Sequence, residues 1–272
     1  LGHGITVGGA LDAFSLRCAN RLLGNADHLA GIEIALTGLT LKATCNLQLA
    51  LCGASATLSI NGEEQFMDHA LWVSAGSTIT IGRALAGTYS YLAIKGGIST
   101  PQVLGSRSTV VREGIGGLNG QALKPGDFLP ITGLDNPAPA PSPARHWQRQ
   151  LQAKPAAQND ILRLRFLPGL HYDDVTQTCR DTLCAQAFTL SGAANRMAAP
   201  LIGSPVDTGL TKLWSEPTCL GSIQIPPDGQ PLVLLNDRQT MGGYPQLGVI
   251  IPLDRVRLGQ ARAGQQVRLE AM

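Results

Sequence analysis

The residue types best suited to chemistry lie in the stretch Gly96–Gly120, which follows the apolar run Tyr91–Ile94. The stretch contains seven glycines and two arginines. Long loops inside compact domains are usually either functional or disordered, and glycine lets the backbone turn sharply and approach a ligand closely. Because apolar residues are spaced through the stretch, we predict an ordered, ligand-facing loop rather than a linker.

Within this loop, Arg107 stands between two serines, Ser106 and Ser108. A guanidinium can bind a carboxylate or phosphate through a fork of two hydrogen bonds, and hydroxyl and backbone N–H groups can complete the shell. An equally weighted alternative is that Arg107 bonds to carbonyl groups of its own loop. Both interpretations stay open at this stage.

A second polar segment, residues 236–246, follows the short apolar run Leu232–Leu235. Asp237 could hold Arg238 in orientation, while Arg238 or Gln239 contacts a ligand. The aspartate and arginine could equally form a structural bridge between two parts of the chain. The pattern does not decide between these roles.

Three further residues are weaker candidates for substrate binding. Asn195 and Arg196 follow a turn at Gly192, and Arg196 is the third basic candidate. Tyr244 stands before a proline in a predicted turn, and its hydroxyl could contact a ligand.

The composition excludes several classes of partner. Charged residues make up 15% of the 272 residues, and the net charge is +2, so nothing favours binding to nucleic acid or to an anionic membrane. No apolar run approaches the roughly 18 residues that span a bilayer, and the first residues carry no signal-peptide pattern. We therefore expect a cytoplasmic protein.

The familiar catalytic and metal-binding motifs are absent from the sequence. It has no phosphate-binding G-x-x-x-x-G-K-[ST] loop, no G-x-S-x-G elbow and no H-E-x-x-H. The six cysteines form no C-x-x-C pair, and the five histidines are scattered. We predict no metal site, and we expect buried free thiols in a reducing compartment.

Hydrophobic periodicity predicts mostly strands. One helix is expected near the start, where Asp12 can cap it, Phe14, Cys18 and Leu22 recur at helical spacing, and Gly24 can end it. The predicted strands include Ile161–Leu167, with both arginines on one face, Ser77–Ile81, Leu232–Leu235 and Val249–Ile251.

Alternating prolines at 136–144 predict an extended spacer that cannot join a sheet interior. We therefore place an N-terminal domain at residues 1–136, a proline-rich linker at 137–158 and a C-terminal domain at 159–272.

Similar segments recur in the same order on the two sides of this linker, which suggests two copies of one β-rich unit. The matched pairs are Leu49–Ala54 with Phe188–Ala193, Gly76–Ile81 with Gly221–Ile225, and Lys124–Leu129 with Arg262–Val267. Under this duplication, the loop at 96–120 corresponds to the segment at 236–246. A site shared between the two loops would follow, since pockets favour domain interfaces.

Three long motifs resemble a known family: GALDAFSLRCANRLLGN, GGISTPQVLGSRSTVVREGIGGLNGQALKPGD and PPDGQPLVLLNDRQTMGGYPQLG. The family is that of the 5-oxoprolinase C subunit, also described as allophanate hydrolase subunit 2-like, biotin-dependent carboxyltransferase-like or KipI antagonist. The resemblance implies a mainly β fold with two cyclophilin-like β-barrel domains and few short helices. Members of the family carry an earlier strand before the position of Leu1, so we expect the sequence to be incomplete at its start.

The resemblance also implies an activity and partners. Members work with a KipI-like B subunit, and often with an A subunit, to open the lactam of 5-oxoproline to glutamate with ATP hydrolysis. We therefore expect a protein that is inactive alone, with ATP used at the level of the complex. The alternatives are a regulatory KipI antagonist and a carboxyltransferase-like component of a urea carboxylase or allophanate pathway.

On this resemblance, the candidate residues take roles in stabilising the negative charge that amide activation develops. Arg107, Arg238, Asp237 and Gln239 are the predicted catalytic group, in which Asp237 orients Arg238. The predicted substrate-binding residues are Ser106, Ser108, Asn195, Arg196 and Tyr244.

Overall fold

A computed structural model describes residues 4–133, 160–211 and 213–272. Contacts divide the chain into two compact units: an N-terminal unit, Asp12–Pro155, and a C-terminal unit, Ala156–Met272 together with Leu1–Leu11. The predicted linker at 137–158 lies outside the described residues.

The assignment of the first residues differs from the boundary drawn on the sequence, which placed them in the N-terminal domain. Hydrogen bonds explain their place in the C-terminal unit. Asn236 Nδ2 donates to the carbonyl oxygens of Gly8 at 3.1 Å and Ala10 at 2.9 Å, and Arg196 Nη2 donates to Gly9 O at 2.7 Å. These bonds join residues more than 180 positions apart in sequence, so local patterns do not predict them.

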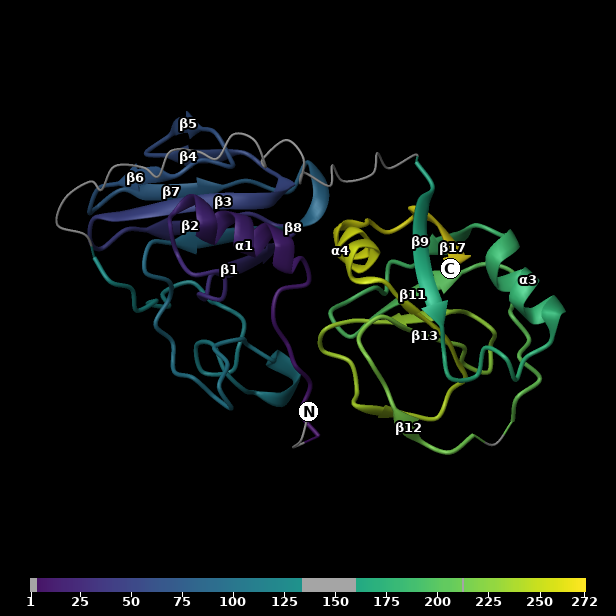
Figure 1. Ribbon diagram of the computed structural model, residues 1–272. Coiled ribbons are helices and arrows are strands. Elements are labelled where there is room, and N and C mark those ends of the chain that lie inside the picture. Colours follow the sequence, from purple (N-terminus) through teal and green to yellow (C-terminus); the bar gives the residue numbers. More distant parts are fainter. Residues whose placement is uncertain (1–3, 134–159, 212) are drawn as a thin grey trace. The chain divides into compact units, whose positions relative to one another are not determined.

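The N-terminal unit contains two four-stranded antiparallel sheets, with strand orders β1-β8-β3-β6 and β2-β7-β4-β5 (Figure 1). Its elements are α1 (Ala13–Leu22), β1 (Ile32–Ala35), β2 (Leu39–Lys42), β3 (Leu47–Ser55), β4 (Leu58–Ile60), β5 (Glu63–Gln65), β6 (Leu71–Val73), β7 (Thr78–Ile81), β8 (Ala86–Ile94) and the 3-10 turn η1 (Val111–Glu113).

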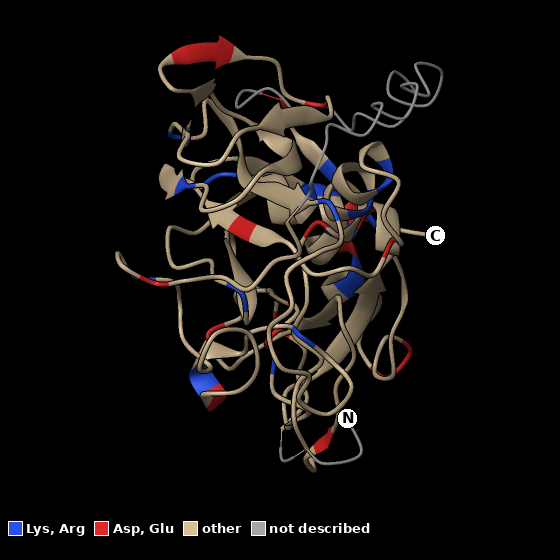
Figure 2. Cartoon of the chain, turned by 90° about the vertical axis from the view of Figure 1, so that its left-hand side faces the viewer, with Lys and Arg blue, Asp and Glu red and all other residues tan. Residues whose placement is uncertain are grey.

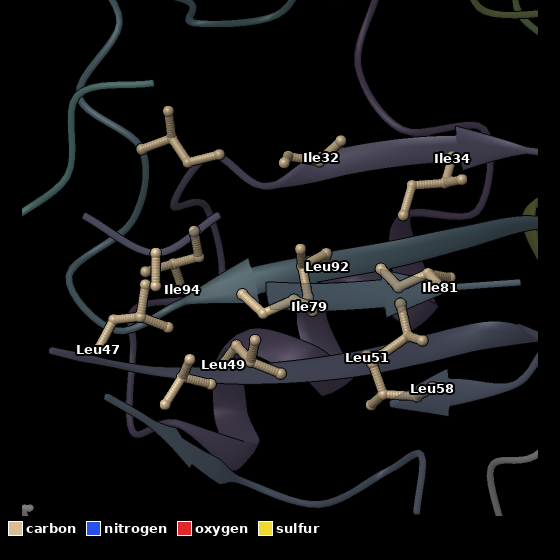
Figure 3. Close-up of a cluster of buried hydrophobic side chains, with 13 residues drawn as sticks. Ile32, Ile34, Leu47, Leu49, Leu51, Leu58, Ile79, Ile81, Leu92 and Ile94 are labelled. Carbon is tan, nitrogen blue, oxygen red and sulfur yellow. The ribbon is translucent and has the colours of Figure 1, made fainter. Parts of the chain in front are cut away.

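The main core of this unit is aliphatic and draws side chains from both sheets (Figure 3). Leu49 and Leu51 of β3 and Leu92 of β8 belong to the same buried cluster as Ile79 and Ile81 of β7. Alternation along β3 sends every second side chain into this cluster, which explains why the strand is rich in leucine.

The opposite face of β3 and β8 is covered by α1. Ala50 and Ala93 pair directly across the two strands and pack with Ala19 of the helix. Such small side chains let a helix lie close to a sheet. Asp12 caps α1 as predicted, because its side chain accepts from Ser15 N at 2.9 Å.

The buried stripe of α1 is displaced from the one that the spacing predicts. Ser15, Ala19 and Leu22 are buried, whereas Phe14 and Cys18 are only half-buried. Ala19 packs against the alanine pair beneath the helix, and Leu22 and Leu23 belong to the same buried cluster.

The C-terminal unit contains a closed barrel with strand order β10-β11-β14-β13-β16-β9-β17 and a separate two-stranded ribbon, β12-β15. Its elements are β9 (Leu162–Pro168), α3 (Gln177–Ala185), β10 (Phe188–Leu190), β11 (Ala198–Ile202), β12 (Glu216–Pro217), β13 (Ser222–Gln224), β14 (Leu232–Leu234), β15 (Met241–Gly242), β16 (Gln246–Ile250), α4 (Pro252–Gln260) and β17 (Gln266–Ala271). Strands β17 and β9 pair in parallel, whereas the other barrel pairs are antiparallel.

The predicted fold class, mainly β with few short helices, is confirmed. Strand β9 shows the predicted alternation, with Leu162, Leu164 and Phe166 buried and the arginines between them on the other face. The segments matched as repeats have different strand partners in the two units. Strand β3 pairs directly with β8, whereas β11 lies between β10, which belongs to the match of β3, and β14, which precedes the loop matched to the one after β8.

Basic and acidic residues are interspersed along the chain (Figure 2), in keeping with the small net charge. All six cysteines are free thiols as predicted, but only Cys52 and Cys179 are buried. Within the described part of the chain, no group of three or more His, Cys, Asp or Glu side chains is placed to hold a metal ion. Over the same residues, no helix combines the length and the apolar character needed to cross a membrane.

A buried carboxylate ties α4 to the barrel. Asp254 is fully buried and accepts from the backbone N–H of Arg165 at 2.9 Å, from its guanidinium at 2.8 and 3.1 Å, and from Arg257 at 3.1 Å. Burial alone would raise the pKa of Asp254. The hydrogen bonds from the two arginines outweigh burial and hold the pKa below its usual 3.8.

We predict that Asp254→Asn lowers the free energy of unfolding by about 2 kcal/mol at neutral pH, the usual scale for hydrogen bonds to a charged group. Because the folded pKa is depressed, the stabilisation is present above the unfolded value near 3.8 and is lost as pH falls through the folded pKa. Urea unfolding from pH 7 to pH 2.5 should therefore show the variant and the native chain converging in acid. The matched control is Asp173→Asn, whose carboxylate is 94% exposed; an equal loss in both variants would contradict the prediction.

Candidate functional site

The glycine-rich loop is ordered, as predicted, and it begins with a tight turn. Val103 and Ser106 exchange backbone hydrogen bonds of 2.8 and 3.0 Å. The two residues between them, Leu104 and Gly105, have φ values of 51° and 77°. Positive φ at both central positions is the pattern of a type I′ turn, which reverses the chain immediately before Arg107.

Further along, the loop folds against itself at a glycine. Val110 and Ile115 form an isolated antiparallel bridge, and this places Gly116 directly against Ser108. A Cβ atom at Gly116 would overlap the carbonyl oxygen of Ser108, and the φ of Gly116 is +73°. Glycine is therefore required here for both space and conformation.

Arg107 is half-buried at the start of this fold. Over the described residues, its guanidinium makes no hydrogen bond or ion pair, so it does not hold its own loop together. Ser106 Oγ instead accepts from Ser108 N at 3.1 Å and supports the backbone around the arginine. The sequence left open whether Arg107 binds a ligand or bonds to carbonyl groups of its own loop. The described residues show no such bond to the loop.

The second predicted segment follows β14, and its Asp237 forms an ion pair with Arg196. The Asp237 carboxylate accepts from Arg196 Nε at 2.8 Å and from Arg196 Nη2 at 3.0 Å, and Asp237 N donates to Arg196 O at 2.9 Å. The carboxylate therefore orients Arg196 and not Arg238, in contrast to the role expected for it. Since Arg196 also donates to Gly9, this pair attaches the first residues of the chain to the loop.

Of the two arginines in the predicted catalytic group that lack a partner among the described residues, Arg238 is the more deeply buried. It is 4% exposed, and its Nε and Nη1 atoms are buried without a hydrogen-bond partner in the described residues. Its backbone N–H closes a turn onto Leu235 O at 3.2 Å. Burial lowers the pKa of the Arg238 guanidinium from its ordinary value, because desolvation disfavours the charged form.

The remaining candidates divide between structural and exposed positions. Asn195 Oδ1 accepts from Met197 N at 2.8 Å, which makes it a turn residue. Gln239 is half-buried, and its backbone carbonyl oxygen accepts from Thr218 Oγ1 at 2.5 Å. Tyr244 is exposed. Of these three residues, only Gln239 and Tyr244 have side chains left for an outside ligand.

Sequence reasoning missed a buried polar layer beside the second loop. Gln246 Oε1 accepts from Ser222 Oγ at 3.2 Å, its Nε2 donates to Pro217 O at 3.2 Å, and its backbone N–H donates to His171 Nδ1 at 3.1 Å. The neighbouring Gln224 side chain is buried, and its amide atoms have no partner among the described residues. These residues lie far apart in the sequence, so no motif marks them.

A second basic residue, Arg255, was also missed. It lies on α4, and its Nη1 atom donates to Leu220 O at 3.2 Å. Burial lowers the pKa of Arg255, and the positive charge of Arg238 lowers it further. Pro252 at the first turn of α4 is a helix-start signal that could have predicted the helix but not the position of this side chain.

The candidate residues therefore form two groups, each within one unit. Ser106, Arg107 and Ser108 belong to the N-terminal unit, and the residues around Arg238 belong to the C-terminal unit. The structure brings Arg196 to Asp237, and it brings Arg255 into the electrostatic range of Arg238.

Comparison with known proteins assigns the chain to a family. The family described as carboxyltransferase domain, subdomain A and B, matches residues 3–271. The chain belongs to this family.

The matching relatives carry two kinds of name. The chain is 36% identical to the 5-oxoprolinase C subunit of Escherichia coli K12, over 97% of this chain and 82% of that protein. It is 32% identical to the 5-oxoprolinase C subunit of Haemophilus influenzae, over 99% and 84% of the two chains. Urea amidolyase of Saccharomyces cerevisiae is 26% identical over 97% of this chain, which corresponds to 15% of the larger protein.

Solved structures also include matches of two kinds. The crystal structure of TTHA0988 matches with a TM-score of 0.84 and 33% identity, over 98% of this chain. This chain spans 50% of that one. Urea amidolyase of K. lactis matches with a TM-score of 0.89 and 25% identity, where this chain covers 17% of the larger protein. The fold thus occurs both in proteins named as subunits and as a small part of much longer chains.

The geometry of the glycine-rich loop gives a matched pair of substitutions. Gly114 and Gly116 both have positive φ, but a Cβ at Gly114 meets nothing within 4 Å. We predict that Gly116→Ala destabilises the N-terminal unit by about 1–3 kcal/mol more than Gly114→Ala, because only the former crowds the backbone. Urea unfolding and limited proteolysis near Ser108 would measure the difference. Equal effects would mean that conformation alone, and not the close approach, requires glycine.

Proposed function

We propose that this chain is the C subunit of an ATP-dependent 5-oxoprolinase complex, which cleaves 5-oxo-L-proline to L-glutamate with ATP hydrolysis. The observation that carries the proposal is the 36% identity over nearly the whole chain to a protein named as the C subunit of 5-oxoprolinase. The chain would act with a KipI-like B subunit and an A subunit, would be inactive alone, and would work in the cytoplasm.

Within this proposal, Arg238 is the residue best suited to meet negative charge. Opening a lactam places charge on the carbonyl oxygen and on the phosphoryl group that activates it, and fixed cations in a desolvated site stabilise such charge. Arg238 is buried, and its Nε and Nη1 atoms lack a partner in the described residues, so its N–H groups are free for a ligand. Arg196 has a different role, since its charge is already balanced by Asp237.

Arg107 is the corresponding proposal for the N-terminal unit. Its guanidinium is half-buried and is held on a turn whose backbone is fixed by the Val103–Ser106 hydrogen bonds. A preorganised backbone with an uncommitted guanidinium is suited to an anionic group.

A second candidate function is supported by the similarity to urea amidolyase. On that alternative, the chain would transfer a carboxyl group from biotin to urea or a related amide, and it would need a biotin carboxylase and a biotin carrier. The identity to the yeast enzyme is lower, at 26%, and we therefore rank this function second.

We predict that the chain, reconstituted with the A and B subunits from the same organism, gives ATP hydrolysis that depends on 5-oxo-L-proline. Arg238→Gln should reduce that activity by about 100-fold or more, the scale of losing one preorganised donor. The matched control is Arg163→Gln, which removes a 61% exposed arginine of the same unit that pairs with Glu270 and should change activity less than about twofold.

Thermal unfolding would establish that both variants are folded. A folded Arg238→Gln complex with full activity would remove Arg238 from the site. If urea, but not 5-oxo-L-proline, stimulates ATP hydrolysis when a biotin carboxylase and carrier are added, the second candidate function replaces the first.

A further inference from the structure

Three strand ends meet at one end of the C-terminal barrel, and Gly221 lies among them. Gly221 N donates to Leu234 O of β14 at 2.8 Å, and Ile250 N of β16 donates to Gly221 O at 2.9 Å. Gly221 itself immediately precedes β13. The chain leaving β14 leads to Arg238, and the chain leaving β16 leads into α4.

The packing at Gly221 brings Arg255 into this group. A Cβ atom at Gly221 would lie 3.4 Å from Arg255 Cδ and 2.9 Å from Ile250 O, and the φ of Gly221 is +90°. The aliphatic part of Arg255 therefore lies over the glycine, and its Nη1 atom donates to Leu220 O. Glycine is favoured here by the close Ile250 carbonyl oxygen and by the positive φ, and the arginine packs on it at van der Waals distance.

Cys219 and Ser222 complete the cluster. Cys219 is exposed, its N–H donates to Ser222 Oγ at 3.2 Å, and its Sγ lies 3.1 Å from the same oxygen. Cys219 lies next in sequence to Leu220, whose carbonyl oxygen accepts from Arg255 Nη1. An exposed thiol thus lies one residue from the carbonyl group that Arg255 binds.

No carboxylate of the described residues compensates the two arginines. Other arginines of the same unit do have carboxylate partners. Arg196 pairs with Asp237, and both Arg165 and Arg257 pair with Asp254. Leaving a charge buried without a partner is costly, and proteins avoid it by pairing the charge or by binding a counter-ion. Arg238 is 4% exposed, and it and half-buried Arg255 lack a carboxylate partner among the described residues, so the pair is suited to an anion from outside the chain.

We propose that Arg238 and Arg255 bind a small oxyanion, a carboxylate or a phosphate group, at the barrel end formed by Cys219–Ser222. Arg238 presents its unpartnered Nε and Nη1 atoms, and a guanidinium fork matches two oxygens of either group. The anion must be small, because Arg238 is 4% exposed. This inference rests on the proposed function for the role of Arg238 and adds Arg255 as a second ligand-binding residue.

Cys219 provides a direct reporter for the site in the isolated full-length chain. Peptide mass spectrometry would measure its alkylation by iodoacetate, which is anionic, and by iodoacetamide, which is neutral, with half-buried Cys45 as the internal reference. The ratio of the two rates should be about tenfold higher at Cys219 than at Cys45, because two nearby positive charges attract the anionic reagent. Arg255→Gln should lower that ratio by about fivefold or more, and Arg163→Gln should leave it unchanged.

Protection experiments would identify the anion. Inorganic phosphate, 5-oxo-L-proline and the neutral lactam 2-pyrrolidinone would each be added before iodoacetamide. We expect phosphate or 5-oxo-L-proline to slow the alkylation of Cys219, and 2-pyrrolidinone to have no effect. Protection by phosphate alone identifies a phosphate site, and protection by 5-oxo-L-proline identifies a carboxylate site.

The proposal is overturned if neither anion protects Cys219, or if protection persists in folded Arg255→Gln. Because labelling uses the chain alone, failure here is distinct from failure of the complex to hydrolyse ATP with 5-oxo-L-proline. A complex that is active while Cys219 is unprotected would keep the proposed function and remove the anion site. If an anion protects Cys219 but 5-oxo-L-proline does not stimulate ATP hydrolysis by the complex, the anion site stands and the proposed function is removed.

Discussion

The compensation of buried charge is the constraint on which the C-terminal unit depends. Asp254 is fully buried and is neutralised by two arginines, which attach α4 to β9. Asp237 is neutralised by Arg196, and this pair lies where the first residues of the chain meet the second loop. Against this background, Arg238 stands out because it is buried without such a partner in the described structure. A charge that the fold leaves uncompensated is a strong indication of a ligand.

Glycine solves a different problem in each unit. In the N-terminal unit, Gly116 allows one part of the long loop to lie directly against another, so the loop is compact although it has little regular secondary structure. In the C-terminal unit, Gly221 adopts a positive φ close to the Ile250 carbonyl oxygen, and Arg255 packs over it. An arginine lies close to each of these glycines, since Arg107 precedes Ser108 in sequence and Arg255 packs over Gly221, and a preorganised cation can stabilise developing charge without reorganisation.

The family relationship and the physical analysis support each other at different levels. Membership in the carboxyltransferase-domain family rests on a match over residues 3–271. The same fold occurs in proteins named as 5-oxoprolinase C subunits and in urea amidolyases, so the fold alone does not select a substrate. Under the proposed function, the arginines of this chain would meet the negative charge that activation of an amide develops.

Strand β9 and the cap of α1 were predictable, because alternation and capping are local properties that neighbouring residues decide. The two loops were also recognisable from their composition, which combines glycine with polar and apolar residues. The partner of Asp237 was not predictable, since Arg196 is 41 residues away and reaches it only through the pairing of β11 with β14. Nor could the chain indicate that Arg255 would approach Arg238, because that proximity depends on where three strands end. Local hydrogen bonds and hydrophobic periodicity follow from the sequence alone, because neighbouring residues make them. Which distant charges pair depends on the tertiary structure, because the strands that carry them meet only when the barrel closes.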